Sequence, residues 1–384
     1  MDKKWRIIEL PCSELNLDIQ ANFNDPNATG LVHLTNLINE LDAFVPTKDT
    51  KGLALLLIRE KYINKDLIGM ILPKIYQLLD QRGITDFKVI TNAWQYDDNI
   101  FNQFNNLVFC HSFLLRTYEK IGQRGHYITQ WNRNANKVLF LTGKPYKYQR
   151  IGLAFKFYLK PALHSSMDWS FFADPNKLEE YKAWILDQYT EQEYNDFINS
   201  FQRNLDPATN PYYQESMNFY GYDYDLSLFN NTSLSVISET EFQTLDYLDV
   251  TSTGDKINPY CVISEKTWKT ILNRHPFIMA GRVDIIPKLK SLGFRTFENY
   301  LKLPNYYSIE DMNDRLNAIV ENTEHYIMNP PSDEVKNQIN DDVEFNFTQL
   351  MSLINGEYDK LINVFSGSRQ TVDEIIVQNL TETN

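Results

Sequence analysis

Two acidic residues each stand directly after a short stretch that contains β-branched side chains. Glu239 follows Ser235-Val236-Ile237-Ser238, and Glu265 follows Cys261-Val262-Ile263-Ser264, 26 positions further along the chain. Parallel strands that lie side by side end at the same edge of a sheet, so the two carboxylates are expected to point into one crevice. A carboxylate in that position can accept hydrogen bonds from the hydroxyl groups of a ribose.

The residues around Glu265 also predict the start of a helix over 265–272. Ser264 is a typical N-cap residue, which places Glu265, Lys266 and Thr267 in the first turn. A helix N-terminus offers unpaired N–H groups and a partial positive charge to an anion, and a lysine there can meet a diphosphate. The simpler interpretation is an ordinary cap in which the helix dipole favours Glu265, and the spacing alone favours this simpler interpretation.

The segment between Arg116 and Lys160 is basic within an acidic chain. It contains ten Lys and Arg residues and one acid, Glu119, whereas the whole chain has a formal net charge of −13. Such a segment suits a phosphate-bearing ligand, because Arg offers a bidentate fork and Lys a point charge to phosphate oxygens. The alternatives are a solvated basic face, or ion pairs with the acidic helices expected over 174–200, and the sequence leaves both open.

These residues need elements that hold them in place, and the hydropathy pattern predicts two series of strands and helices. In the first series, strands are expected at 53–58, 87–91 and 107–111, with a helix over 67–79 that stops at Gly83. In the second series, strands are expected at 137–142, 233–238, 260–263 and 276–280, with helices at 149–159, 177–203, 265–272 and 285–292. From about residue 308 the pattern is helical and acidic, and it ends in a polar tail.

This succession predicts an α/β protein of two lobes with a cleft between them. We expect an N-terminal, acceptor-side lobe over 1–130, a second lobe over 131–307 and a helical C-terminal segment over 308–384. Open α/β sheets bind ligands at the carboxyl ends of their strands, so the cleft is the expected site.

Three segments of the second series carry a family resemblance. They are Ile237-Ser238-Glu239-Thr240, Ile263-Ser264-Glu265-Lys266-Thr267-Trp268 and His275-Pro276-Phe277-Ile278-Met279-Ala280-Gly281. They resemble the donor-binding half of the α1,3-fucosyltransferases and related GT-B glycosyltransferases, and the following 289–297 is similar to a segment of uncharacterised phage and large-virus proteins. The likeness covers about 233–297, with a weaker match at 137–160. Ser238 and Thr240 stand where the family has Phe and Asn, so the identity of the sugar stays open.

The resemblance implies two Rossmann-like lobes of the GT-B type and the transfer of a sugar from a nucleotide diphosphate donor to a hydroxyl group, inverting and without a metal. By position, Glu265 would bind the ribose and Lys266 the diphosphate, while Glu239 would contact the sugar or shape the pocket as part of the catalytic set. The remaining donor-binding candidates are Lys144, Arg150, Ser264 and Thr267. Cationic groups and a helix N-terminus would stabilise the departing nucleotide while a carboxylate deprotonates the acceptor.

The acceptor hydroxyl needs a catalytic base, and Glu60 is the candidate. It follows the apolar run 53–58, at the expected carboxyl end of a strand. Asp97 and Asp98 are alternatives by the same reasoning. A surface or helix-start acid is the simpler interpretation of Glu60, and it is the one that position alone favours.

A metal site has little support in the sequence. Asp223-Tyr224-Asp225 has the Asp-x-Asp form that holds a divalent metal in GT-A glycosyltransferases, but no clear strand precedes it. The six histidines lack metal-ligand spacing, and the three cysteines are not paired in sequence. We therefore expect neither a metal nor a cofactor besides the nucleotide-sugar co-substrate.

Composition limits the setting and the partners. With 384 residues, 43% of them hydrophobic, and no apolar run of about 18, we expect a cytoplasmic protein without a membrane span, in the host cell if it is viral. The expected partners are the nucleotide sugar and a glycan or other hydroxyl acceptor. One alternative is a DNA-modifying glycosyltransferase that uses the 116–160 segment to follow the phosphate backbone. Another is an inactive fold that binds a nucleotide sugar or a protein.

Overall fold

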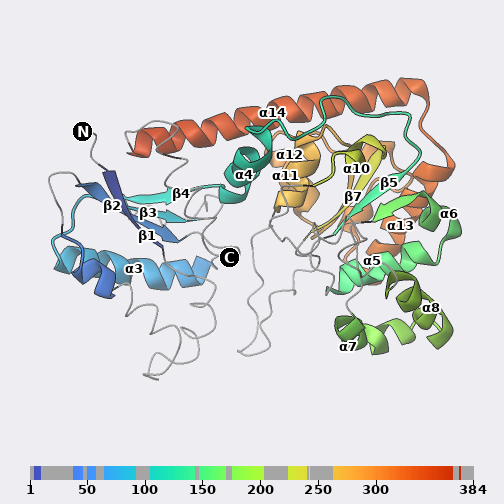
Figure 1. Cartoon of the computed structure of the whole chain (residues 1–384), viewed down its shortest axis with the longest axis horizontal. Helices are drawn as coiled ribbons and strands as arrows, with labels where there is room; N and C mark the ends of the chain where they lie inside the picture. The colour runs from blue at the N-terminus through green and yellow to red at the C-terminus, as the bar shows by residue number, and fades with distance from the viewer. Residues whose placement is uncertain are drawn as a thin grey trace. The chain divides into compact units, whose positions relative to one another are not determined.

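The computed structural model describes residues 4–9, 38–45, 50–57, 65–91, 104–142, 147–169, 175–202, 224–239, 242, 263–365 and 372. Among these residues the chain divides into two compact units, with borders after Arg116 and between Leu353 and Ile354. Each unit contains a parallel sheet of four strands, so the protein has a mixed α/β fold (Figure 1).

The sheet of the first unit has the strand order β1-β2-β3-β4, which is also the order along the chain. Its strands are β1 (Lys4–Glu9), β2 (Thr50–Leu57), β3 (Phe87–Thr91) and β4 (Leu107–Phe109). The predicted strand at 87–91 is confirmed, whereas β1 was not predicted. Helix α3 (Lys65–Gln81) connects β2 to β3, and the chain turns after it at Gly83, where φ is 65°.

Helices lie on both faces of this first sheet (Figure 1). On one face, the ring of Tyr76 in α3 lies 5.1 Å from that of Phe87 in β3. On the other face lies the end of α14 (Asp333–Phe365), where the ring of Phe365 is 5.2 Å from that of Trp5 in β1. Two covered faces explain why β2 is a nearly continuous apolar run.

The sheet of the second unit has the order β6-β5-β7-β8. Its strands are β5 (Val138–Leu141), β6 (Met167–Trp169), β7 (Leu234–Ser238) and β8 (Phe277–Ala280). Three of them coincide with predicted strands, and β6 was not predicted. Of the strand expected at 260–263, only Ile263 lies within the described residues, and it belongs to no strand.

Further helices follow in chain order. They are α4 (Ser112–Thr117), a π-helical turn (Tyr118–Gly122), α5 (Tyr148–Tyr158), α6 (Pro161–Ser166), α7 (Pro175–Leu186), α8 (Glu191–Gln202), α10 (Ser227–Asn230), α11 (Glu265–Leu272), α12 (Ile285–Ser291) and α13 (Met312–Met328), with 3₁₀ turns at Glu298–Tyr300 and Tyr306–Ser308. The expected helix at 265–272 is confirmed residue for residue. No described helix is both long enough and apolar enough to cross a membrane.

Alternation along the strands divides the second core between the two faces of the sheet. Phe140, Val236 and Ile278 belong to the cluster that packs with α5 and α13, which include Phe157 and Leu316. The intervening strand residues face the other side, where α11 packs against β7. Every residue of β5, β7 and β8 is therefore buried.

The strand order also fixes where a ligand is expected. From β5 the chain passes to β6 on one side, and it later returns to form β7 on the other side of β5. The connections that leave β5 and β7 therefore run in opposite directions, which opens a crevice outside the carboxyl ends of this strand pair. The residues that follow β5 and β7 therefore lie where a ligand is expected to bind.

Candidate functional site

Glu239 lies at this crevice, directly after β7, and its main chain ties several elements together. Its N–H donates to the carbonyl of Ala280 at the end of β8, with an N···O distance of 2.9 Å. Its own carbonyl oxygen accepts from Gln149 Nε2 at 3.2 Å and from Arg150 Nη2 at 3.4 Å. The first turn of α5 is thus attached to the end of β7, and both donor side chains are buried.

The side chain of Glu239 holds the first turn of α11. One carboxylate oxygen, Oε1, accepts from the main-chain N–H of Ser264 at 3.1 Å and from the hydroxyl of Thr267 at 2.5 Å. Glu239 is fully buried and is bonded on its side chain and on its main chain. In this geometry the carboxylate fixes the start of α11 against the end of β7.

Lys266 lies between the carboxylates of Glu239 and Glu265. Its Nζ is 3.8 Å from Glu239 Oε2 and 3.5 Å from Glu265 Oε1. Both distances exceed an ordinary hydrogen bond of about 2.7–3.2 Å, so the ammonium group is attracted to both acids and bonded tightly to neither. Its N–H groups can therefore turn towards an incoming anion.

Glu265 remains ionised in these surroundings. Burial raises the pKa of its carboxyl, but the charges of Lys266, Lys269 and Arg150, together with a main-chain N–H, outweigh burial and hold the pKa below its usual value. The side chain is 12% exposed, so the carboxylate can still be reached. It can accept hydrogen bonds from the hydroxyl groups of a ligand.

Ser264 caps α11 as predicted. Its backbone is extended, and its Oγ accepts from the N–H of Lys266 at 3.3 Å. Arg150, Glu239 and 264–267 come from three separate parts of the chain, and the fold brings them together at one edge of the sheet. Their proximity is a property of the fold, and their roles in binding and catalysis stay predictions.

Two further polar residues of this edge were not among the predicted site residues. Gln149 donates to Glu239 as described above, and Ser238, the last residue of β7, is fully buried. Among the described residues, the Ser238 hydroxyl has no hydrogen-bond partner. An unpaired buried hydroxyl lowers stability by about 1–3 kcal/mol, so a polar residue at the end of a buried strand is a sequence feature that can indicate a site.

Several predicted residues lie outside the described part of the chain. They are Glu60, Asp97, Asp98, Lys144 and Asp223. Asp225, the other acid of the Asp-x-Asp pattern, is exposed, and its Oδ1 accepts from the N–H of Ser227 at 2.8 Å at the start of α10. Hydrogen bonds from the hydroxyl and, second, from the N–H of Ser227 lower the pKa of Asp225. No described group of three or more His, Cys, Asp or Glu residues could hold a metal ion.

Five described bases of the 116–160 segment are ion-paired or buried. Ion pairs join Lys120 to Glu119 at 3.4 Å, Lys137 to Asp168 at 2.9 Å and Lys160 to Glu324 at 2.9 Å. Arg150 and Lys156 are buried. The acids of these ion pairs are not in the helices over 174–200.

His275 has a structural environment. It is buried, its Nδ1 is 2.8 Å from Ser235 Oγ, and its Nε2 is 2.8 Å from the carbonyl oxygen of Thr232. Burial lowers the pKa of the imidazole to about 4, against the opposing effect of the Thr232 carbonyl, so the ring is neutral at pH 7.

The second unit thus contains a Rossmann-like parallel sheet whose switch-point edge carries two acids, two cations and a helix N-terminus. This combination can bind a molecule that has both an anionic group and hydroxyl groups. No family model, curated protein or solved structure matches the chain.

Proposed function

We propose that the second unit binds a nucleotide diphosphate sugar at the carboxyl edge of its sheet and transfers the sugar to a hydroxyl acceptor. The observation that carries this proposal is the convergence of Arg150, Glu239 and the first turn of α11 at the point where the strand order reverses. This is the place where open α/β sheets bind nucleotides.

Each group at the edge supplies one part of the binding chemistry. The ionised carboxylate of Glu265 accepts hydrogen bonds from the ribose hydroxyls, and Lys266 faces the diphosphate through N–H groups that its long contacts leave available. Arg150 adds a second positive charge. As the sugar leaves, these cations and the N-terminus of α11 stabilise the negative charge that develops on the nucleotide.

We further propose that the two units form the two lobes of a GT-B arrangement. In this arrangement the first unit would supply the acceptor site and the catalytic base, with Glu60 as the candidate. We propose transfer with inversion and without a metal, because cationic side chains are already present where the leaving group would lie.

The two alternatives differ in what supports them. A DNA acceptor would need a continuous basic track, and five of the described bases between 116 and 160 are instead ion-paired or buried. An inactive binding fold shares all the donor contacts and differs only in turnover. The experiment below separates the inactive fold from an active transferase.

The test is release of the nucleoside diphosphate from UDP-, GDP-, ADP-, CDP- and TDP-sugars by the full chain. We expect one nucleotide class to be turned over, and Lys266→Met to lower kcat/KM about 10- to 100-fold, because a charge-assisted hydrogen bond contributes roughly 1.5–3 kcal/mol. Lys137→Met is the matched control, since Lys137 precedes β5 at the opposite edge of the sheet and pairs with Asp168. Binding without turnover would favour the inactive fold, and neither binding nor turnover of any donor would refute the proposal.

A further inference from the structure

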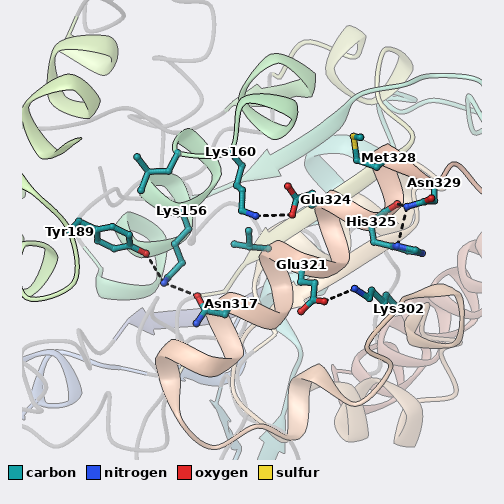
Figure 2. Close-up of a pocket in the computed structure, with 12 residues that line it drawn as sticks. Lys156, Lys160, Tyr189, Lys302, Asn317, Glu321, Glu324, His325, Met328 and Asn329 are labelled. Atoms are coloured by element: carbon teal, nitrogen blue, oxygen red, sulfur yellow. Dashed lines mark hydrogen bonds and ion pairs between the residues drawn. The ribbon is translucent and has the colours of Figure 1, made fainter. Parts of the chain in front are cut away.

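A cavity lies in the second unit, away from the edge just described. It has a volume of about 580 Å³ and is lined by residues of α5, α13 and the segments around Tyr189 and Lys302 (Figure 2). This volume falls within the range of about 300–1,000 Å³ that is typical of small-molecule sites. Lys156, in the last turn of α5, lies about 9 Å along the helix axis from Arg150, so the cavity is at the other end of that helix.

Lys156 is the unusual residue of this cavity. It is 8% exposed, and its Nζ donates to the hydroxyl of Tyr189 at 2.9 Å and to Oδ1 of Asn317 at 2.8 Å (Figure 2). Both partners are neutral, and among the described residues no carboxylate pairs with Lys156. Burying an ammonium ion without a counter-charge is costly, and an ammonium has three N–H donors, of which these bonds use two.

Each of the other two lysines of the cavity forms an ion pair with a glutamate. Lys160 pairs with Glu324 at 2.9 Å and Lys302 with Glu321 at 2.7 Å, and both lysines are nearly half exposed (Figure 2). Three lysines against two glutamates leave one positive charge in excess, and it belongs to the buried Lys156. The two glutamates would repel a polyanion such as a nucleoside diphosphate or nucleic acid.

The rest of the lining indicates the body of the ligand. Asn317, His325, Asn329 and the two glutamates present hydrogen-bonding groups, which suit hydroxyl groups better than a hydrocarbon. The ring of Tyr189 is held in place by Phe155, with 4.7 Å between the ring centroids.

From these observations we infer that the cavity binds a small hydroxylated molecule carrying a single anionic group, a phosphate or a carboxylate, which Lys156 receives. The anion supplies the counter-charge that Lys156 lacks and accepts its third N–H. The hydroxyl groups bond to the amides and carboxylates of the rim. This inference does not depend on the function proposed for the other edge.

The test uses the full chain in a thermal-shift titration with glucose 6-phosphate, gluconate and neutral glucose. At least one anionic probe should raise the melting temperature and glucose should not, and the probe that binds identifies the anionic group. Lys156→Met should abolish the shift, while the unliganded melting temperature stays the same or rises because a buried unpaired charge has been removed. Lys137 is a partly exposed, ion-paired lysine of the same unit, and Lys137→Met should keep the shift.

A gain-of-binding variant makes the test independent of how Lys156→Met folds. Glu324→Gln removes a negative charge from the rim and releases Lys160, so it should bind the anionic probe several-fold more tightly. The inference is overturned if no anionic probe binds, if glucose binds equally well, or if Glu324→Gln leaves the affinity unchanged. A clear fall in the unliganded melting temperature of Lys156→Met would also contradict it, since Lys156 would then serve the fold.

Discussion

The hydroxyl of Thr267 and the carboxylate of Glu239 attach the first turn of α11 to the end of β7. Replacing Thr267 by Val keeps the shape of the side chain and removes one of the donors to a fully buried carboxylate. We expect Thr267→Val to lower the free energy of unfolding by about 1–3 kcal/mol, measured by urea denaturation.

Thr270→Val is the matched control on the same helix. The Thr270 hydroxyl is equally buried but donates to a helix carbonyl, that of Lys266, at 2.9 Å. Thr270→Val should lower the free energy of unfolding by less than Thr267→Val does, because no charged group loses a hydrogen-bond donor. If both variants lowered the free energy of unfolding equally, the hydrogen bond to Glu239 would stabilise the fold no more than the bond to the helix carbonyl.

His275 gives the stability of the protein a defined pH dependence. Burial lowers the pKa of the folded imidazole to about 4, below its unfolded value of about 6.5, so between these values the unfolded chain binds more protons. Stability from this group is therefore fully present above pH 6.5 and is lost as the pH falls towards 4, by up to about 3 kcal/mol.

The measurement is the urea midpoint between pH 7 and pH 4.5 for the wild type and for His275→Gln. The variant should show a smaller decrease than the wild type, whereas the exposed His164→Gln should follow the wild type. Parallel curves for His275→Gln and the wild type would exclude His275 as the cause.

Single residues of the site differ in how well the sequence reveals them. Glu239 and Glu265 were predicted to share a crevice because each follows a strand-like stretch, and both now lie within reach of Lys266. The surroundings of Lys156 could not be predicted, since Asn317 joins it only through the packing of α13 on α5. The one signal was a lysine between Phe155 and Phe157 in an apolar run.

At the scale of elements, α11 shows how a cap can serve both a fold and a site. Ser264→Ala should cost about 1 kcal/mol of unfolding free energy, because an N–H at the start of α11 loses its acceptor. Asp311→Ala removes a comparable cap from α13, where the carboxylate accepts from the N–H of Asp314 at 2.9 Å.

The two cap variants should differ in function. Both should lower stability by similar amounts, but only Ser264→Ala should weaken the binding of a nucleoside diphosphate, measured by calorimetric titration. If Asp311→Ala weakened binding to the same extent, the effect would come from stability alone and α11 would have no particular part in the site.

Helices and strands with a clear hydropathy pattern were predicted well, whereas very short strands and strands that contain charged residues were not. β3 and α11 match their predicted bounds because an apolar run or an amphipathic turn pattern with a cap begins and ends clearly. β6 has only three residues, and β1 contains charged residues, so neither shows a strand pattern. Both strands exist because neighbouring strands provide their hydrogen bonds.

At the scale of the whole molecule, α14 belongs to both units. Its residues up to Leu353 belong to the second unit, where Glu344 pairs with Arg274 at 3.0 Å. From Ile354 onward they belong to the first unit, where Glu357 accepts from the N–H of His111 at 3.3 Å. No local pattern in a helix reveals that its two ends belong to different cores, so the predicted division at residues 130 and 307 stays a prediction.

Phe365 provides a test of this assignment. It is fully buried against Trp5 of β1, so Phe365→Ala should destabilise the first unit by about 3–5 kcal/mol and accelerate amide exchange in β1 and β2. Phe345 lies on the same helix within the second unit and is 39% exposed, so Phe345→Ala should leave exchange in β1 and β2 unchanged. Unchanged exchange in Phe365→Ala would contradict the assignment.

Binding of a nucleoside diphosphate at the carboxyl edge of the second sheet is tested by a thermal-shift titration with GDP, UDP, ADP, CDP and TDP, with and without a divalent metal. A ligand at about 100 times its Kd adds roughly 2.7 kcal/mol to the folded state, which is easily detected. We predict that one nucleotide stabilises the wild type and Lys156→Met without a metal, and that the shift is lost in Lys266→Met. A failure of all five nucleotides to stabilise the chain, or an undiminished shift in Lys266→Met, would contradict the account.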